Sequence, residues 1–99
     1  MKIPKKVTVA GVVLRVEWAD MEGKWGDYDN DKHLIRLSKS LKKEKPDMAV
    51  ATLLHEMVHA SLRLTGVSEV LGDDNEEAVA VNIECIYLPA ILKLLVDRD

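Results

Sequence analysis

His55, Glu56 and His59 spell the pattern HExxH within the apolar string LLHEMVHA. Two histidines four positions apart lie on one face of a helix, so both imidazoles can reach a single Zn²⁺ ion. Glu56 is rotated around the helix axis and can reach a zinc-bound water without being a ligand, which is the position that a general base needs. Zinc lowers the pKa of such a water to about 7 and polarises a carbonyl group. The motif therefore predicts a hydrolytic site with Glu56 as catalytic base and His55 and His59 as metal ligands.

The alternative is that these three residues are ordinary polar residues of a helix, solvated or hydrogen-bonded in the core. Apolar residues occur on nearly every side of this helix, which predicts that it is buried centrally. Burying three polar groups there without partners would cost on the order of several kcal/mol. A metal ion supplies the missing partner, so the sequence favours the zinc interpretation.

A catalytic zinc usually has three protein ligands and one open position, so a third ligand is required. The metzincin extension of the motif would place Gly and His where this chain has Leu62 and Thr65. That class is therefore excluded. A deformylase-like site would need a cysteine ligand well before the helix, whereas Cys85 follows it. Cys85 is instead expected to be a core residue, because free cysteine commonly behaves as a small hydrophobe.

The remaining ligand candidates are Glu76 and Glu77, which open the following helix. Glu76 lies three, four and seven residues before an apolar stripe that begins with Val79, Ala80 and Ile83, so it is expected to face inward and is the preferred ligand. Glu77 remains the alternative, since it also has apolar companions at helical spacing. Either glutamate also has the spacing of a capping box with a preceding aspartate, a role that needs no metal.

The elements that position these residues follow from the hydrophobic period. Apolar residues at nearly every second position predict strands over about 6–37: two short antiparallel strands around Ala10 and Gly11, a turn-rich loop over 19–32, and a third strand over 33–37. The Lys-rich segment 38–45 is expected to be a solvated connector. Pro46 and Asp47 suit the start of an active-site helix over about 46–65, and caps precede a second long helix over about 75–96.

Composition and charge limit the class of protein. The 99 residues carry 14 Lys and Arg against 17 Asp and Glu, with 47% hydrophobic residues. This predicts one α+β domain over 1–99, with a small three-stranded antiparallel sheet packed on the central HExxH helix. The net charge of −3 argues against nucleic acid as a partner, although a lysine cluster over 39–45 is the one feature in favour of a DNA-associated protein.

Localisation is expected to be cytoplasmic. A single cysteine cannot form an internal disulfide, and the amino terminus lacks the charged and apolar regions of a secretory signal. The longest nearly uncharged stretch, 78–92, is interrupted by polar residues and is too short to span a membrane. No membrane association is therefore expected.

The chain resembles a minimal gluzincin. A β-rich amino terminus, the segment WGDYDNDKHLIRL, the helix with LLHEMVHA and the EE pair follow one another in the order found in minigluzincins and in small SprT-like or phage-encoded HExxH zinc metallopeptidases. The resemblance covers residues from about Trp25 to Pro89. It implies a zincin-like fold in which the strand 33–37 borders the cleft and pairs with an extended peptide or protein substrate. It also implies that His55, His59 and one of Glu76 and Glu77 bind zinc while Glu56 is the base.

The resemblance is incomplete at the oxyanion. Larger gluzincins have a His or Tyr that stabilises it, whereas here Tyr28 and Tyr87 are expected to pack or anchor loops. Such a group contributes about 10²-fold or more to the rate, so slow or latent hydrolysis is expected. The sequence thus predicts a zinc-dependent peptidase of a prokaryotic or phage-infected cell. The alternative is a non-catalytic zinc-binding or protein-interaction module with a decayed or latent site.

Overall fold

The alternating residues near the amino terminus form a β-hairpin. The structure, a computed structural model, describes residues 2–97. Strands β1 (Lys6–Val9) and β2 (Val12–Ala19) pair antiparallel, as predicted, with Val9 opposite Val12. The two turn residues, Ala10 and Gly11, both have positive φ, of 50° and 77°. A two-residue type I′ turn needs this conformation at both positions.

The sheet contains four strands rather than the expected three. The segment predicted as loop contains β3 (Gly26–Asp29), which pairs antiparallel with β4 (Leu34–Ser38). The order is β1-β2-β4-β3, and β4 runs parallel to β2, so the sheet is mixed. The α+β class is confirmed, whereas the three-stranded antiparallel sheet was wrong. Turn-forming residues hid β3, whose formation depends on pairing with β4.

The position of β4 corrects a second expectation. This strand, predicted as the edge that pairs with substrate, has β2 on one side and β3 on the other. Its main-chain groups are therefore used within the sheet. The free edge on this side of the molecule belongs to β3, because β3 follows β4 in the strand order.

The lysine-rich segment after the sheet is a helix and not a solvated connector. Helix α1 (Lys39–Glu44) begins after Ser38, whose hydroxyl accepts a hydrogen bond from the backbone N–H of Ser40 at 3.3 Å. Leu41 is fully buried. The serine cap and the buried leucine stabilise this short helix against the rest of the fold, while its lysines remain exposed.

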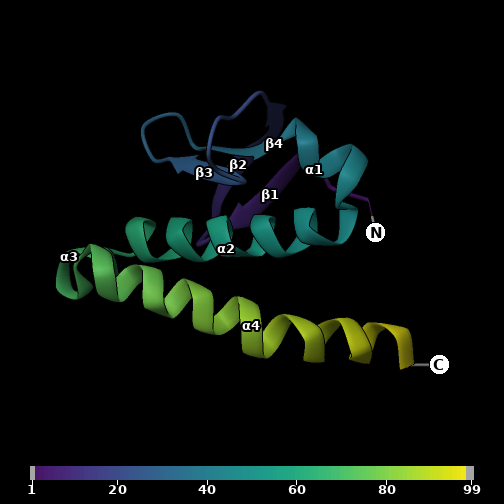
Figure 1. The fold of residues 1–99 in the computed structure, drawn as a ribbon. Coiled ribbons are helices and arrows are strands. Elements are labelled where there is room, and N and C mark those ends of the chain that lie inside the picture. The colour runs from purple at the N-terminus through teal and green to yellow at the C-terminus, as the bar shows by residue number, and fades with distance from the viewer. Residues whose placement is uncertain (1, 98–99) are drawn as a thin grey trace.

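Helix α2 (Pro46–Leu64) lies in the middle of the molecule, as predicted for 46–65. The sheet covers one side of it and helix α4 (Asp73–Asp97) runs along the other (Figure 1). Leu53 and Ala60 of α2 belong to the same buried cluster as Leu14, Ile35 and Leu37 of the sheet. Helix α2 is therefore packed between the sheet and α4.

The chain turns from α2 into α4 through a further short helix, α3 (Val67–Leu71). Helix α4 begins at Asp73, two residues before the expected start, and includes Pro89. Its first half packs on α2 with Ala80 fully buried, whereas Ile86, Tyr87 and Cys85 are exposed. The expectations that Cys85 is a core residue and that Tyr87 packs were wrong. Glu84 is the residue of this part of α4 that contacts α2, at His55, and the three residues that follow it are exposed. Among the described residues, no helix is both long and apolar enough to cross a membrane.

Candidate metal centre

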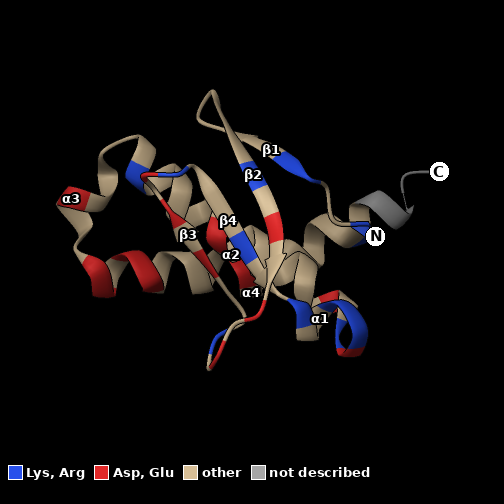
Figure 2. Cartoon of the chain, turned by 90° about the horizontal axis from the view of Figure 1, so that it is seen from above, with Lys and Arg blue, Asp and Glu red and all other residues tan. Residues whose placement is uncertain are grey.

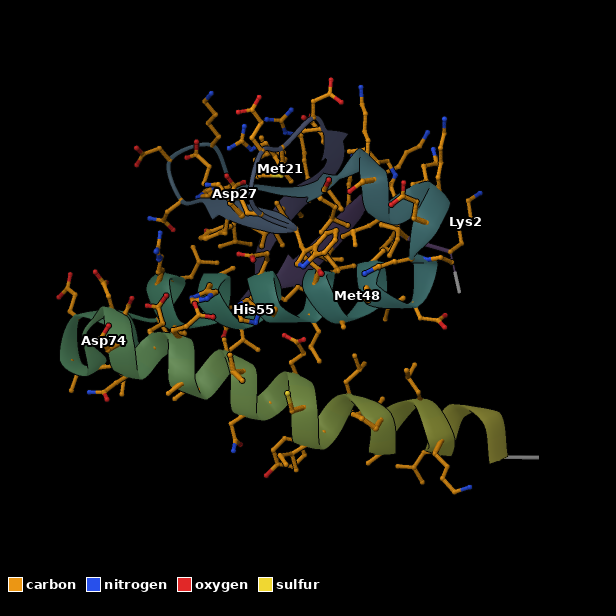
Figure 3. The ribbon with its side chains drawn as sticks, in the orientation of Figure 1. Lys2, Met21, Asp27, Met48, His55 and Asp74 are labelled. Atoms are coloured by element: carbon orange, nitrogen blue, oxygen red, sulfur yellow. The ribbon has the colours of Figure 1, made fainter. Side chains whose placement is uncertain are left out.

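The helical spacing of the two histidines brings their rings together. His55 and His59 lie on the face of α2 that is turned toward α4 (Figure 3). Their Nε2 atoms are 3.2 Å apart, and the two side chains are only 16% and 13% exposed. The packing of α4 on α2 therefore encloses both rings, with their Nε2 atoms next to each other.

Glu77 completes a group of three residues that could donate electron pairs to a metal ion, called the donor residues below. Its Oε1 atom lies 2.7 Å from Nε2 of His55, and its Oε2 atom lies 3.2 Å from Nε2 of His59. One donor atom from each residue lies within 4.8 Å of the other two. The Glu77 carboxylate reaches this point from just after the first turn of α4, and its side chain is 55% exposed.

Two further carboxylates contact the Nδ1 atoms of the two rings. The Nδ1–H of His55 donates to Oε1 of Glu84 at 2.8 Å, and the Nδ1–H of His59 donates to Glu76. These assignments follow from the hydrogen-bond network, since both Nδ1 atoms face carboxylates. Histidine ligands of metals are commonly oriented in this way, through a carboxylate on the nitrogen that does not bind the metal.

The donor set fits a zinc ion. With the Nδ1 protons directed at Glu84 and Glu76, each neutral ring presents the lone pair of Nε2 to the common point. Two lone pairs and the Glu77 carboxylate repel one another there unless a cation lies among them. Two imidazoles and one carboxylate are the ligands of known catalytic His₂Glu zinc sites, and borderline-soft Zn²⁺ suits this mixture.

Glu76 faces inward, as its helical phase predicted, but it does not reach the Nε2 side of the rings. Its side chain is 4% exposed; besides His59, the hydroxyl of Ser68 donates to it, and Nε of Arg63 lies 3.6 Å away. Burial raises the pKa of Glu76, but the hydrogen bonds from Ser68 and His59 outweigh it and hold that pKa below its usual value. The preference for Glu76 over Glu77 does not match this geometry. Helical phase separated inward from outward residues, but it could not identify the ring nitrogen that each carboxylate reaches.

Glu56 is buried beside the histidines and is 8% exposed. Its burial raises the pKa of its carboxyl group above the usual range, while His55 and His59 act in the opposite direction. A carboxyl group with a raised pKa is a better proton acceptor near neutral pH than an exposed glutamate. The residue predicted as the base therefore has the environment that this role requires.

Comparison with known proteins identifies a family. The model of the SprT-like family matches residues 6–76, which is most of the chain. The chain belongs to the SprT-like family. No curated protein and no solved structure matches it. SprT-like domains are associated with zinc, which agrees with the group of His55, His59 and Glu77.

The family match includes the HExxH motif but ends before Glu77 and Glu84. In this SprT-like domain those two residues come from α4, seven positions apart and therefore on one face of that helix. Sequence reasoning missed the role of Glu84 at His55, although its spacing from Glu77 was the available signal. It also missed Ser68 and Arg63, for which neither motif nor spacing gives any indication.

The cleft of this SprT-like domain lies between α2 and the edge strand β3. One cavity of about 340 Å³ contains the whole candidate centre, and its lining includes His55, Glu56, His59 and Glu77. A second cavity of about 280 Å³ extends the cleft toward Trp25 and Met48. The two cavities share His55 and Glu56 with Lys24 and Gly26 of the β3 region. The site is thus open on both sides of Glu56.

Tyr28 lines the same cleft but already has a partner. Its hydroxyl donates to Oδ1 of Asn30 at 2.8 Å, and burial raises its pKa. This agrees with the expected loop-anchoring role of Tyr28.

Proposed function

We propose that this SprT-like domain is a zinc-dependent metallopeptidase. The observation that carries the proposal is that the three donor residues and the buried carboxyl group of Glu56 line one open cavity. A proton acceptor beside a metal site in a cleft that is accessible to substrate is the combination that hydrolysis requires. The donor group has three members among the residues whose side chains the structure describes, which leaves one position for a reactant. This favours catalysis over a structural zinc, because structural sites have four protein ligands.

In the proposed reaction His55, His59 and Glu77 hold the ion, and Glu84 and Glu76 fix the orientation of the two imidazoles. Zinc, when bound, polarises the scissile carbonyl and lowers the pKa of the attacking water. Glu56 accepts the proton of that water and transfers it to the leaving amine. Its burial raises the pKa of its carboxyl group, which favours this role as proton acceptor.

The proposed substrate is an extended peptide or protein segment that pairs with β3. This strand is the free edge next to α2, and Gly26 at its start lines both cavities of the cleft. Main-chain pairing with an edge strand orients a peptide without requiring a particular sequence. Trp25, Met48 and Ala51 provide an apolar wall on one side of Glu56, which suits an apolar substrate side chain.

The test measures zinc content and peptide hydrolysis on the same preparations. Zinc-loaded protein is incubated with a mixture of fluorescence-quenched peptides, beside the variants Glu56→Gln and Glu69→Gln. Loss of the base should reduce hydrolysis by about 10²–10⁴-fold while one zinc per chain is retained. Glu69→Gln, an exposed residue of α3 away from the cleft, should leave both quantities unchanged.

Two results would contradict the proposal. Hydrolysis by Glu56→Gln at the wild-type rate would remove Glu56 from the mechanism. Zinc-loaded wild-type protein that cleaves none of the peptides would instead support the non-catalytic zinc-binding module.

A further inference from the structure

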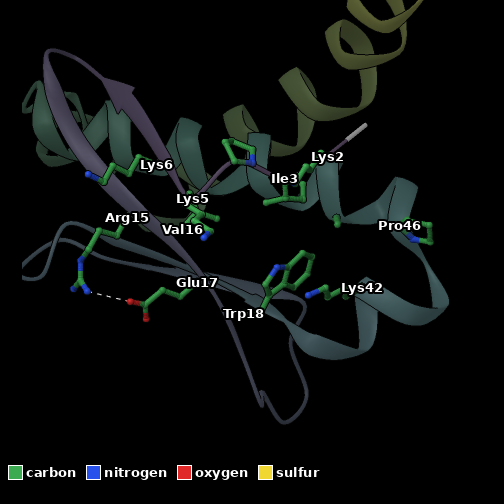
Figure 4. A pocket seen from close by; sticks show the side chains of 12 residues that line it. Lys2, Ile3, Lys5, Lys6, Arg15, Val16, Glu17, Trp18, Lys42 and Pro46 are labelled. Carbon is green, nitrogen blue, oxygen red and sulfur yellow. Dashed lines mark hydrogen bonds and ion pairs between the residues drawn. The ribbon is translucent and has the colours of Figure 1, made fainter.

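A further cavity, larger than the two cavities of the cleft, lies away from the metal centre. It has a volume of about 820 Å³ and is formed by the N-terminal segment, the end of β2, α1 and the start of α2 (Figure 4). Its walls are mainly apolar and include Ile3, Val16, Trp18 and Ala49. The candidate zinc ligands do not line it. The volume is in the range of cavities that bind ligands, about 300–1,000 Å³.

The cavity is located where the sheet loses a strand. Strand β1 pairs with β2 only as far as Lys6 opposite Arg15, and the last hydrogen bond runs from the N–H of Val16 to the carbonyl of Lys5 at 2.9 Å. The chain then departs from the sheet at Pro4, which has no N–H to donate. Among the residues that the structure describes, no strand pairs with positions 17–19 of β2 on this side.

The free stretch of β2 presents main-chain groups to the cavity. In an extended strand, alternate residues direct their N–H and C=O groups to the same side. Since the N–H of Val16 points toward β1, the N–H and C=O groups of Trp18 point the same way, into the space that β1 has left. Residues from both faces of the sheet line the cavity, among them Trp18 from the inner face and Glu17 from the outer face. The cavity therefore includes the open edge itself.

Positive charge surrounds this edge. Lysine and arginine residues gather on β1, β2 and α1, whereas α3 and the start of α4 are acidic (Figure 2). The cations that line the cavity are Lys2, Lys5, Lys6, Arg15 and Lys42, and the acidic lining residue, Glu17, is paired with Arg15 at 3.0 Å. Nζ of Lys42 lies 5.6 Å from the centroid of the Trp18 ring, so the indole is itself close to a cation (Figure 4).

We infer that this cavity docks an extended acidic peptide segment of a partner protein, which adds a strand to the free end of β2 and places one apolar side chain against Trp18. Each part of the ligand follows from one feature of the site. The unpaired main chain of Trp18 accepts a strand, the apolar wall accepts the side chain, and the surrounding lysines attract carboxylates. Single-stranded nucleic acid fits less well, because it needs several aromatic platforms in succession and Trp18 is the one aromatic side chain in the lining. The inference does not depend on peptidase activity.

The binding test uses a fluorescein-labelled peptide in which glutamate alternates with valine. Fluorescence anisotropy is measured against the zinc-loaded protein, and mass spectrometry verifies that the peptide stays intact. Saturable binding is expected below about 1 mM, with backbone amide shifts in NMR spectra concentrated in segments 2–6 and 15–19. No binding up to that concentration, or shifts confined to the zinc cleft, would overturn the inference.

A pair of charge-matched variants tests the cation rim. Lys5→Glu combined with Lys42→Glu removes two cations that line the cavity, and Lys32→Glu combined with Lys43→Glu makes the same change in net charge at exposed positions outside it. The first pair should weaken peptide binding about tenfold or more while the second has little effect. If both pairs weaken peptide binding equally, the attraction is a general effect of net charge, and the inferred docking site is contradicted. Circular dichroism of all variants confirms folding.

Two further probes test strand addition and the class of ligand. A peptide with N-methyl groups on alternate amides cannot donate those main-chain hydrogen bonds, so its affinity should fall about tenfold or more. Affinity equal to that of the unmodified peptide would refute strand addition. Oligothymidylate of equal charge should bind more weakly than the peptide; tighter binding with a steep dependence on salt would instead assign the cavity to nucleic acid.

Discussion

Oε1 of Glu84 lies 2.8 Å from Nδ1 of His55, although 29 residues separate the two in the sequence. On the opposite side of the same ring, Nε2 lies 2.7 Å from Oε1 of Glu77. Glu77 and Glu84 are two helical turns apart on α4, so this one helix contacts both nitrogens of His55. The orientation of the imidazole is therefore determined by how α4 packs on α2.

The first prediction concerns Glu84. Replacing it with alanine removes the acceptor of the Nδ1–H of His55, so zinc affinity should fall by about 10–100-fold. Competition with a chelator of known affinity measures this change. Glu69→Ala, an exposed acidic residue of α3, removes the same charge without touching the centre and should bind zinc like the wild type. Equal affinity in the two variants would show that Glu84 does not orient the ligand.

The second prediction separates the adjacent glutamates of α4. Because Glu77 faces Nε2 of both rings, Glu77→Ala should lower zinc affinity more than Glu76→Ala, whose loss should stay within about 10–100-fold. Removal of Glu76 should also destabilise the zinc-free protein by about 1–3 kcal/mol, since Ser68 loses its hydrogen-bond partner in a partly buried position. Isothermal titration and urea unfolding measure the two effects. Weaker zinc binding in Glu76→Ala than in Glu77→Ala would make Glu76 the third ligand.

The third prediction concerns the close approach of β3 to α2. A Cβ atom on Gly26 would lie 2.8 Å from the carbonyl oxygen of Arg36 and 2.8 Å from Cγ2 of Thr52. Gly26→Ala should therefore reduce the free energy of unfolding by about 1–3 kcal/mol, as overpacking does. Denaturant unfolding measures this loss. Combining it with Thr52→Ser removes only the methyl contact and should restore part of the stability; an unchanged stability of Gly26→Ala alone would contradict the packing described here.

The fourth prediction concerns the ion pair between β3 and β4. Hydrogen bonds from the Arg36 guanidinium lower the pKa of Asp27 below its ordinary value of 3.8. A carboxyl group with a lowered pKa in the folded state stabilises the fold above its unfolded pKa, and this contribution is lost as the pH falls through the folded pKa. Both side chains are partly exposed, so the contribution should be only about 0.2–1 kcal/mol.

The measurement for this ion pair is the stability difference between the wild type and Asp27→Asn as a function of pH. The wild type should be the more stable protein at neutral pH, and the difference should vanish well below pH 3.8. Asp31→Asn, in an exposed loop, serves as the reference for the loss of one negative charge. A difference that grows on acidification would contradict the sign.

The sequence by itself determined the elements whose signals are local. The HExxH spacing, the long helix around it and the hairpin at Ala10 and Gly11 depend on residues within a few positions of one another, and each lies where the pattern predicted. The inward position of Glu76 also followed from phase along one helix. These features could be predicted because helix and strand periods fix which neighbouring side chains share a face.

Only the tertiary structure decided how separate elements meet. Turn-forming residues concealed β3, and no local pattern indicates that β4 runs parallel to β2 between two neighbours. Likewise, either Glu76 or Glu77 could have faced the Nε2 atoms. Which of the two does so depends on how α4 is rotated about its axis and shifted along α2. The rotation and the shift of α4 are set by the packing of the two helices over their whole contact, which involves residues far apart in the chain. The local pattern thus placed two histidines and a base on one helix, and the packing of α4 determined which carboxylate faces each ring nitrogen.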